Sequence, residues 1–119
     1  MSSSPSRTLL EATEAGSIDL AASVQTSAAG IVSRTVLQTP DLRVVLFAFD
    51  EGQELTAHTN RRRALIQVLS GACEFLFNGE WQTLPAGALL HLPPNHPHAV
   101  RAGQGPFSML LTLGAESAE

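Results

Sequence analysis

From Gly30 to Leu113 the chain alternates between short apolar segments and breaks that contain glycine, proline or Asn-Gly. The segments are rich in β-branched, aliphatic and aromatic residues, and they occupy residues 31–37, 42–49, 64–69, 72–77, 80–84, 89–92, 99–101 and 107–113. Segments of this length and composition are typical of β-strands. Because they are closely spaced and almost no helical pattern separates them, they predict an all-β sandwich or barrel.

The clearest local signal is Asn78-Gly79, which lies between segments 72–77 and 80–84. Asparagine and glycine tolerate the positive φ angles of a type I′ turn, so these two segments are expected to form a β-hairpin. Segment 42–49 carries apolar residues on both faces, which indicates a strand covered on both sides.

The length of 119 residues suits one domain with its own core. We expect an irregular or mobile N-terminal tail over residues 1–16, a single barrel domain over residues 17–114 and a C-terminal tail over residues 115–119. Residues 8–15 could form a turn of helix that Gly16 ends, and residues 18–22 could form a short strand or turn.

Charge and composition narrow the classes of partner. The formal net charge is -4, and the only basic run, Arg61–Arg63, is too short to follow a phosphate backbone, so we expect no nucleic-acid partner. No apolar run approaches the roughly 18 residues of a membrane span, so no membrane partner is expected. The single cysteine, Cys73, cannot form an internal disulfide, and the N-terminus does not resemble a signal peptide. These features predict a cytoplasmic location.

Two motifs connect the strands to a known family. In the first motif, Gly52 is followed after five residues by His58, and Asn60, Ala64 and Gly71 come at further fixed distances. The spacing resembles a Gly-x5-His-x-His-x3/4-Glu-x6-Gly pattern, in which Asn60 takes the place of the second histidine and Ala64 takes the place of the glutamate.

In the second motif, Gly87 is followed after five residues by Pro93, and then by Asn95 and His98. With the Asn-Gly hairpin between them, the two motifs resemble those of the cupin superfamily, which contains small RmlC-like β-barrels of jelly-roll (double-stranded β-helix) type. The resemblance covers about residues 30–113 and implies this fold. It says little about activity, because one fold hosts many functions.

The resemblance implies a possible metal site. Metal-binding cupins hold a divalent transition metal such as Ni, Zn, Fe or Mn with two histidines and a glutamate of the first motif and a histidine of the second. Here His58 and His98 match metal ligands. Asn60 offers only a carbonyl oxygen, while His96 or His91 could supply a third imidazole if its direction allows. We therefore expect no firm cofactor, and a metal at His58 and His98 would be weakly or substoichiometrically bound.

The resemblance also implies which side chains face the cavity. If the position of Ala64 faces inward, alternation along segment 64–69 turns Ile66 and Val68 inward and Leu65, Gln67 and Leu69 outward. An apolar outer face on a small barrel needs a cover. We therefore expect a homodimer, as the resemblance also implies.

These features predict a protein that binds a small organic molecule, without a catalytic metal, in an apolar pocket anchored by His58, Asn60 and His98. His58 and Asn60 are two residues apart, so on a strand both would face inward. Arg62, near the barrel mouth, could bind a carboxylate or phosphate through paired hydrogen bonds. The candidate pocket residues are His58, Asn60, Arg62, Ile66, Val68, His91 and His98.

Two enzyme functions stay open beside the binding function. The first is a metal-dependent dioxygenase- or isomerase-like enzyme, with a site rebuilt around His58 and His98. The second is a metal-free acid–base enzyme, such as an epimerase, that uses the same two histidines, because the pKa of a free imidazole lies near neutrality.

Overall fold

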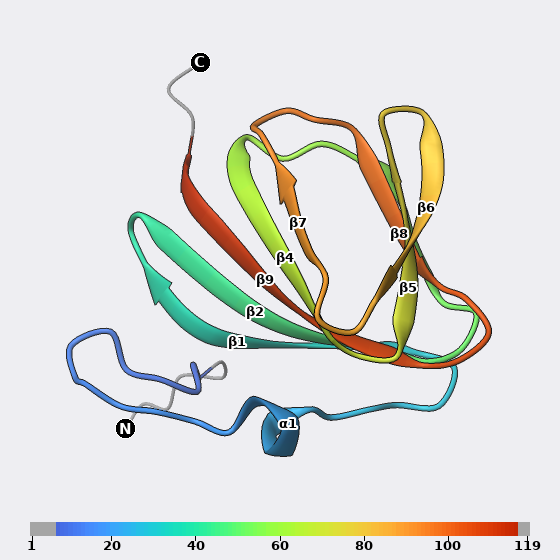
Figure 1. Cartoon of the computed structure of the whole chain (residues 1–119). Coiled ribbons are helices and arrows are strands. Elements are labelled where there is room, and N and C mark those ends of the chain that lie inside the picture. The colour runs from blue at the N-terminus through green and yellow to red at the C-terminus, as the bar shows by residue number, and fades with distance from the viewer. Residues whose placement is uncertain (1–6, 117–119) are drawn as a thin grey trace.

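The computed structural model describes residues 7–116, which form nine strands and one short helix, α1 (Leu20–Ser23). The strands are β1 (Ile31–Thr39), β2 (Leu42–Phe49), β3 (Glu54–His58), β4 (Arg62–Ser70), β5 (Ala72–Phe77), β6 (Glu80–Pro85), β7 (Leu89–Leu92), β8 (His98–Ala102) and β9 (Phe107–Glu116). A five-stranded sheet in the order β1-β2-β9-β4-β7 faces a four-stranded sheet in the order β3-β8-β5-β6 (Figure 1). The predicted all-β jelly-roll fold is confirmed.

The eight predicted segments all lie in strands, and the structure adds β3 to them. Asn78 and Gly79, with φ angles of 54° and 79°, join β5 to β6 as the hairpin signal predicted. The last strand was predicted to end at Leu113, but β9 continues to Glu116 because Glu116 still pairs with Arg62 at the start of β4.

The N-terminal region differs from the prediction. Residues 8–15 form no helix; the backbone amides of Leu9 and Leu10 instead donate hydrogen bonds to the carbonyls of Thr35 (3.1 Å) and Val36 (2.7 Å) at the edge strand β1. Residues 20–23, which overlap the strand or turn predicted over residues 18–22, form α1, where the Asp19 side chain accepts a hydrogen bond from the Ala22 amide at 3.2 Å as an N-cap. Residues 1–6 and 117–119, parts of the two predicted tails, lie outside the described residues.

The hydrophobic core fills the space between the two sheets. Along β4 the burial alternates as predicted: Ala64, Ile66 and Val68 are buried, whereas Leu65 and Gln67 are exposed. Phe49 and Phe107 stack with ring centroids 4.6 Å apart, and Cys73 is fully buried. No helix among residues 7–116 is long and apolar enough to cross a membrane.

Candidate functional site

An apolar cavity of about 80 Å³ lies between the two sheets, and a pair of histidines stands on its wall. The five-stranded sheet contributes side chains from β2, β4 and β9, and the four-stranded sheet contributes side chains from β3, β5 and β8. The lining residues are Phe47, Leu55, His58, Ile66, Phe75, His98, Val100, Met109 and Leu111.

Strand pairing brings His58 and His98 together. The two residues are direct partners in the antiparallel β3–β8 pair, and their ring centroids are 4.3 Å apart in an edge-to-face arrangement. His98 is half-buried, while His58 is exposed. The pair therefore lies where the cavity opens to solvent, and both imidazoles can contact the same bound molecule.

A β-bulge in β3 directs His58 into the cavity. Leu55 pairs with Val100 and His58 pairs with His98, so three steps along β3 match two steps along β8. On a regular strand, residues three apart point to opposite faces. The extra residue cancels this alternation, so Leu55 and His58 both line the cavity.

The backbone fixes which nitrogen of each imidazole carries the proton. His58 Nδ1 lies 2.9 Å from the carbonyl oxygen of Thr56, and His98 Nδ1 lies 2.8 Å from the carbonyl oxygen of His96. A carbonyl oxygen only accepts hydrogen bonds, so each Nδ1 is the donor and each neutral ring keeps its lone pair on Nε2. The site thus presents two hydrogen-bond acceptors or metal-ligating nitrogens.

Burial keeps His98 in its neutral form. It lowers the pKa of His98 below its ordinary value of 6.5, and the charges of His58 and His96 lower that pKa further. The hydrogen bond to the His96 carbonyl acts in the opposite direction. Because burial is the largest of these effects, the His98 imidazole is neutral near pH 7 and its Nε2 remains an acceptor.

The side chains at this site fit a resident catalytic metal poorly. Two Nε2 atoms are suitable nitrogen donors, but Ala64, at the position where the family motif has glutamate, offers no ligand atom. Within the described part of the chain, no three His, Cys, Asp or Glu residues converge in a way that could hold a metal ion. A metal on the histidine pair would need water or a bound molecule for its other ligands.

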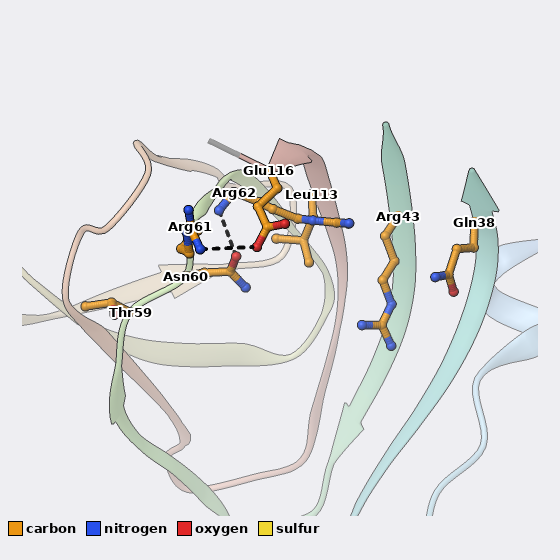
Figure 2. Close-up of a pocket in the computed structure, with 8 residues that line it drawn as sticks. All are labelled: Gln38, Arg43, Thr59, Asn60, Arg61, Arg62, Leu113 and Glu116. Atoms are coloured by element: carbon orange, nitrogen blue, oxygen red, sulfur yellow. Dashed lines mark hydrogen bonds and ion pairs between the residues drawn. The ribbon is translucent and has the colours of Figure 1, made fainter. Parts of the chain in front are cut away.

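Asn60 and Arg62 do not line the histidine cavity. The prediction that Asn60 shares the inward face of His58 is wrong, because β3 ends at His58. The Asn60 Oδ1 instead accepts a hydrogen bond from the Arg62 backbone amide at 2.8 Å. Both residues line a second, polar pocket of about 380 Å³, shown in Figure 2. Its lining residues are Gln38, Arg43, Thr59, Asn60, Arg61, Arg62, Leu113 and Glu116.

The other predicted site residues are also placed away from the cavity, with the exception of Ile66, which lines it. Val68 is buried in the core but is not among the lining residues. His91 is exposed on β7, and its Nε2 accepts a hydrogen bond from the Arg63 guanidinium at 2.7 Å. His96 precedes β8 and contacts His98 through its carbonyl oxygen.

Several lining residues were not singled out from the sequence. Val100 follows His98 by two residues on β8, and Leu111 follows Met109 by two on β9, so alternation was an available signal for both. Leu55 reaches the cavity only because of the bulge, and Arg43 reaches the second pocket only through sheet pairing. No local sequence signal indicates these last two placements.

Two facing antiparallel sheets with a histidine pair near one end define a small jelly-roll barrel protein with an internal site. A family model described as "Cupin domain" matches residues 45–113, which is more than half of the sequence. The chain therefore belongs to the cupin family.

Solved structures extend this likeness over nearly the whole chain. A conserved protein of unknown function from Streptococcus pyogenes is 29% identical, with a TM-score of 0.79 over 97% of this chain and 100% of that one. An RmlC-like cupin from Desulfovibrio desulfuricans is 31% identical, with a TM-score of 0.76 over 85% of this chain and 97% of that one. KdgF from Halomonas sp. is 27% identical, with a TM-score of 0.69 over 77% of this chain and 86% of that one. A search of curated proteins found no match.

Proposed function

We propose that this cupin binds a small organic molecule, with His58 and His98 as polar anchors and without a resident catalytic metal. The observation that carries this proposal is the pair of Nε2 acceptors beside an apolar cavity. A cavity of about 80 Å³ is smaller than the roughly 300–1,000 Å³ of typical ligand sites. The ligand therefore inserts only a small apolar group, and the rest of it lies toward the barrel mouth.

The ligand must bring a hydrogen-bond donor to the histidine pair. Both Nδ1 atoms are engaged by backbone carbonyls, so each ring meets the ligand as an acceptor. A hydroxyl or N–H group next to a short apolar segment satisfies this requirement. Asn60, once expected as a third anchor, belongs to the neighbouring pocket.

This proposal is tested with pairs of short alcohols and their methyl ethers, which differ in the hydroxyl proton. NMR titrations that follow the His58 and His98 ring signals should show saturable shifts with the alcohols and much weaker shifts with the ethers. His98→Leu should remove the difference between the two series, whereas His91→Leu, on the outer surface, should preserve it. Equal binding of alcohols and ethers by the unmodified protein would overturn the anchoring role.

The metal-free part of the proposal needs a separate measurement. Protein purified without an affinity metal and in metal-free buffer should contain well under one equivalent of any transition metal by elemental analysis. Stoichiometric metal that is lost in both His58→Ala and His98→Ala would contradict the proposal.

That result would favour the second candidate function, a metal-dependent enzyme. Its specific support is the hydrogen bond from each Nδ1 to a backbone carbonyl, which is the arrangement that commonly orients metal-ligating histidines. The structure offers only these two donors among the described residues, so we rank this function second.

We further propose that two copies associate through the outer surface of β4 and β7. Leu65 and Leu89 are 41% and 67% exposed there, and apolar side chains gathered on a sheet face favour burial against a partner. Light scattering should give about twice the 12.6 kDa mass of the chain. A monomer mass at micromolar concentration would contradict this association.

A further inference from the structure

The second pocket, called the arginine pocket below, is positively charged although the whole chain has a negative net charge. Although the chain has a net charge of -4, three arginines and a single carboxylate line this pocket. The carboxylate, Glu116, lies 3.9 Å from the Arg61 guanidinium. For Arg43 and Arg62, no ion pair or side-chain hydrogen bond is found with any residue between 7 and 116.

These two guanidinium groups lie over the same part of the five-stranded sheet. Figure 2 shows the Arg62 side chain extending from β4 across β9 toward β2, from which the Arg43 side chain projects. Guanidinium groups bind carboxylates and phosphates strongly because their N–H groups match paired oxygen acceptors. Neither of these two has a side-chain partner among residues 7–116, and the pocket of about 380 Å³ that they line has room for an oxyanion.

The arginine pocket adjoins the histidine cavity along the inner face of the sheet. Arg43 pairs with Leu113, which lines the arginine pocket, and Phe47 pairs with Met109, which lines the cavity. Leu111 of the cavity and Leu113 are consecutive inward positions on β9, about 7 Å apart. The two pockets are therefore adjacent tiers of one inner surface, with the charge at the outer tier.

Backbone contacts also connect the two tiers. The Asn95 amide, in the turn that leads to His98, donates a hydrogen bond to the Asn60 carbonyl at 2.6 Å. The Asn60 side chain in turn accepts a hydrogen bond from the Arg62 amide at 2.8 Å. The loop before Arg62 is thus held against the turn before His98. The backbone positions of the arginine and the histidine are therefore fixed relative to each other.

We propose that Arg43 and Arg62 bind the carboxylate of an organic acid whose apolar part enters the histidine cavity. The identity of the inner contacts rests on the proposed function, whereas the carboxylate site rests on the arginine pocket. An apolar inner tier favours a carboxylic acid with a hydrocarbon body over inorganic phosphate or a phosphorylated sugar, whose polar groups would lose hydration there.

The test uses a homologous series of carboxylates (acetate, butyrate and hexanoate) at constant ionic strength, with the matched primary alcohols butanol and hexanol. NMR titrations of the arginine Nε–Hε signals should show affinity that rises about threefold to fourfold per added CH2 until the cavity is filled. Each carboxylate should bind about tenfold more tightly than the alcohol of equal length.

The variant Arg43→Gln/Arg62→Gln should remove the advantage of the carboxylates over the alcohols. Arg63→Gln is the matched control, because Arg63 belongs to the same arginine run but is hydrogen bonded to His91 on the outer surface. Wild-type protein that binds hexanoate no better than hexanol, or that binds inorganic phosphate more tightly than hexanoate, would overturn this inference.

A terminal hydroxyl separates this inference from the proposed function. 6-Hydroxyhexanoate should bind more tightly than hexanoate, and His98→Leu should remove only that gain, while the double arginine variant removes only the carboxylate gain. Loss of the carboxylate gain alone leaves the histidine site standing. Absence of the hydroxyl gain alone contradicts the histidine anchors but not the arginine site.

Discussion

The two tiers of the inner surface are built from different kinds of residue. The histidine cavity is lined mainly by buried or half-buried side chains of the hydrophobic core, so most of the same residues hold the barrel together and shape the site. Apart from the buried Leu113, the arginine pocket is built from exposed or half-buried side chains at strand ends and in a loop. Substitutions of the side chains in the inner tier are therefore constrained by folding. Substitutions of the exposed side chains in the outer tier can change ligand binding without disturbing the core.

The largest expected effect comes from Phe75→Ala in the inner tier. Phe75 is 1% exposed, lines the cavity and stacks against His98 with ring centroids 6.4 Å apart. Removing a buried phenyl ring typically lowers the free energy of unfolding by about 3–5 kcal/mol. Urea denaturation measures the change. A loss below about 1 kcal/mol would show that this wall is not part of the packed core.

A smaller effect is expected when the pH falls, and it should come from His98. Burial lowers the pKa of His98 from its ordinary value of 6.5, so below about pH 6.5 the unfolded chain takes up a proton at this residue before the folded chain does. The free energy of unfolding should fall as the pH decreases from 6.5 toward the lower folded-state pKa. Above pH 6.5 this contribution should be fully present.

Denaturation at several pH values measures this dependence. His98→Gln should flatten it between pH 6.5 and the folded-state pKa, and His91→Gln provides the control for losing a histidine on the outer surface. A direct NMR titration should give a His98 pKa below 6.5. A value of 6.5 or higher would contradict the dominance of burial over the hydrogen bond to the His96 carbonyl.

The smallest expected effect on stability lies in the outer tier. Arg43→Gln and Arg62→Gln should change the free energy of unfolding by no more than about 0.5 kcal/mol, because neither guanidinium has a partner among the described residues. The same denaturation measurement serves for Phe75→Ala and for these variants. A loss near that of Phe75→Ala would erase the contrast between the two tiers.

Local patterns and motif spacing were enough to predict most of the fold. The turn signals and alternating apolar residues located the strands, and the two motifs predicted that His58 and His98 belong to one site. Both kinds of signal depend on residues that are close together in the chain or at fixed spacing within a motif. A barrel made of short strands and tight turns keeps such residues in a regular geometry.

The errors have specific physical causes. Asn60 was expected beside His58 because alternation was extended past the point where β3 ends. Arg43 was missed because only the pairing of β2 with β9 and of β9 with β4 brings it near Arg62 at the start of β4. One error concerns where a strand ends and the other concerns the pairing of distant strands, and local sequence patterns reveal neither.

The bulge in β3 has a consequence for how this chain tolerates insertions and deletions. The five residues between Gly52 and His58 include the extra one that turns the histidine toward His98. A single deletion between Leu55 and His58 would remove the extra residue, and the histidine, then two positions after Leu55, would still face the cavity by regular alternation. The interval between these two motif residues therefore contains one residue more than regular pairing needs, and a one-residue deletion there should disturb the histidine less than a two-residue deletion, which would turn it to solvent.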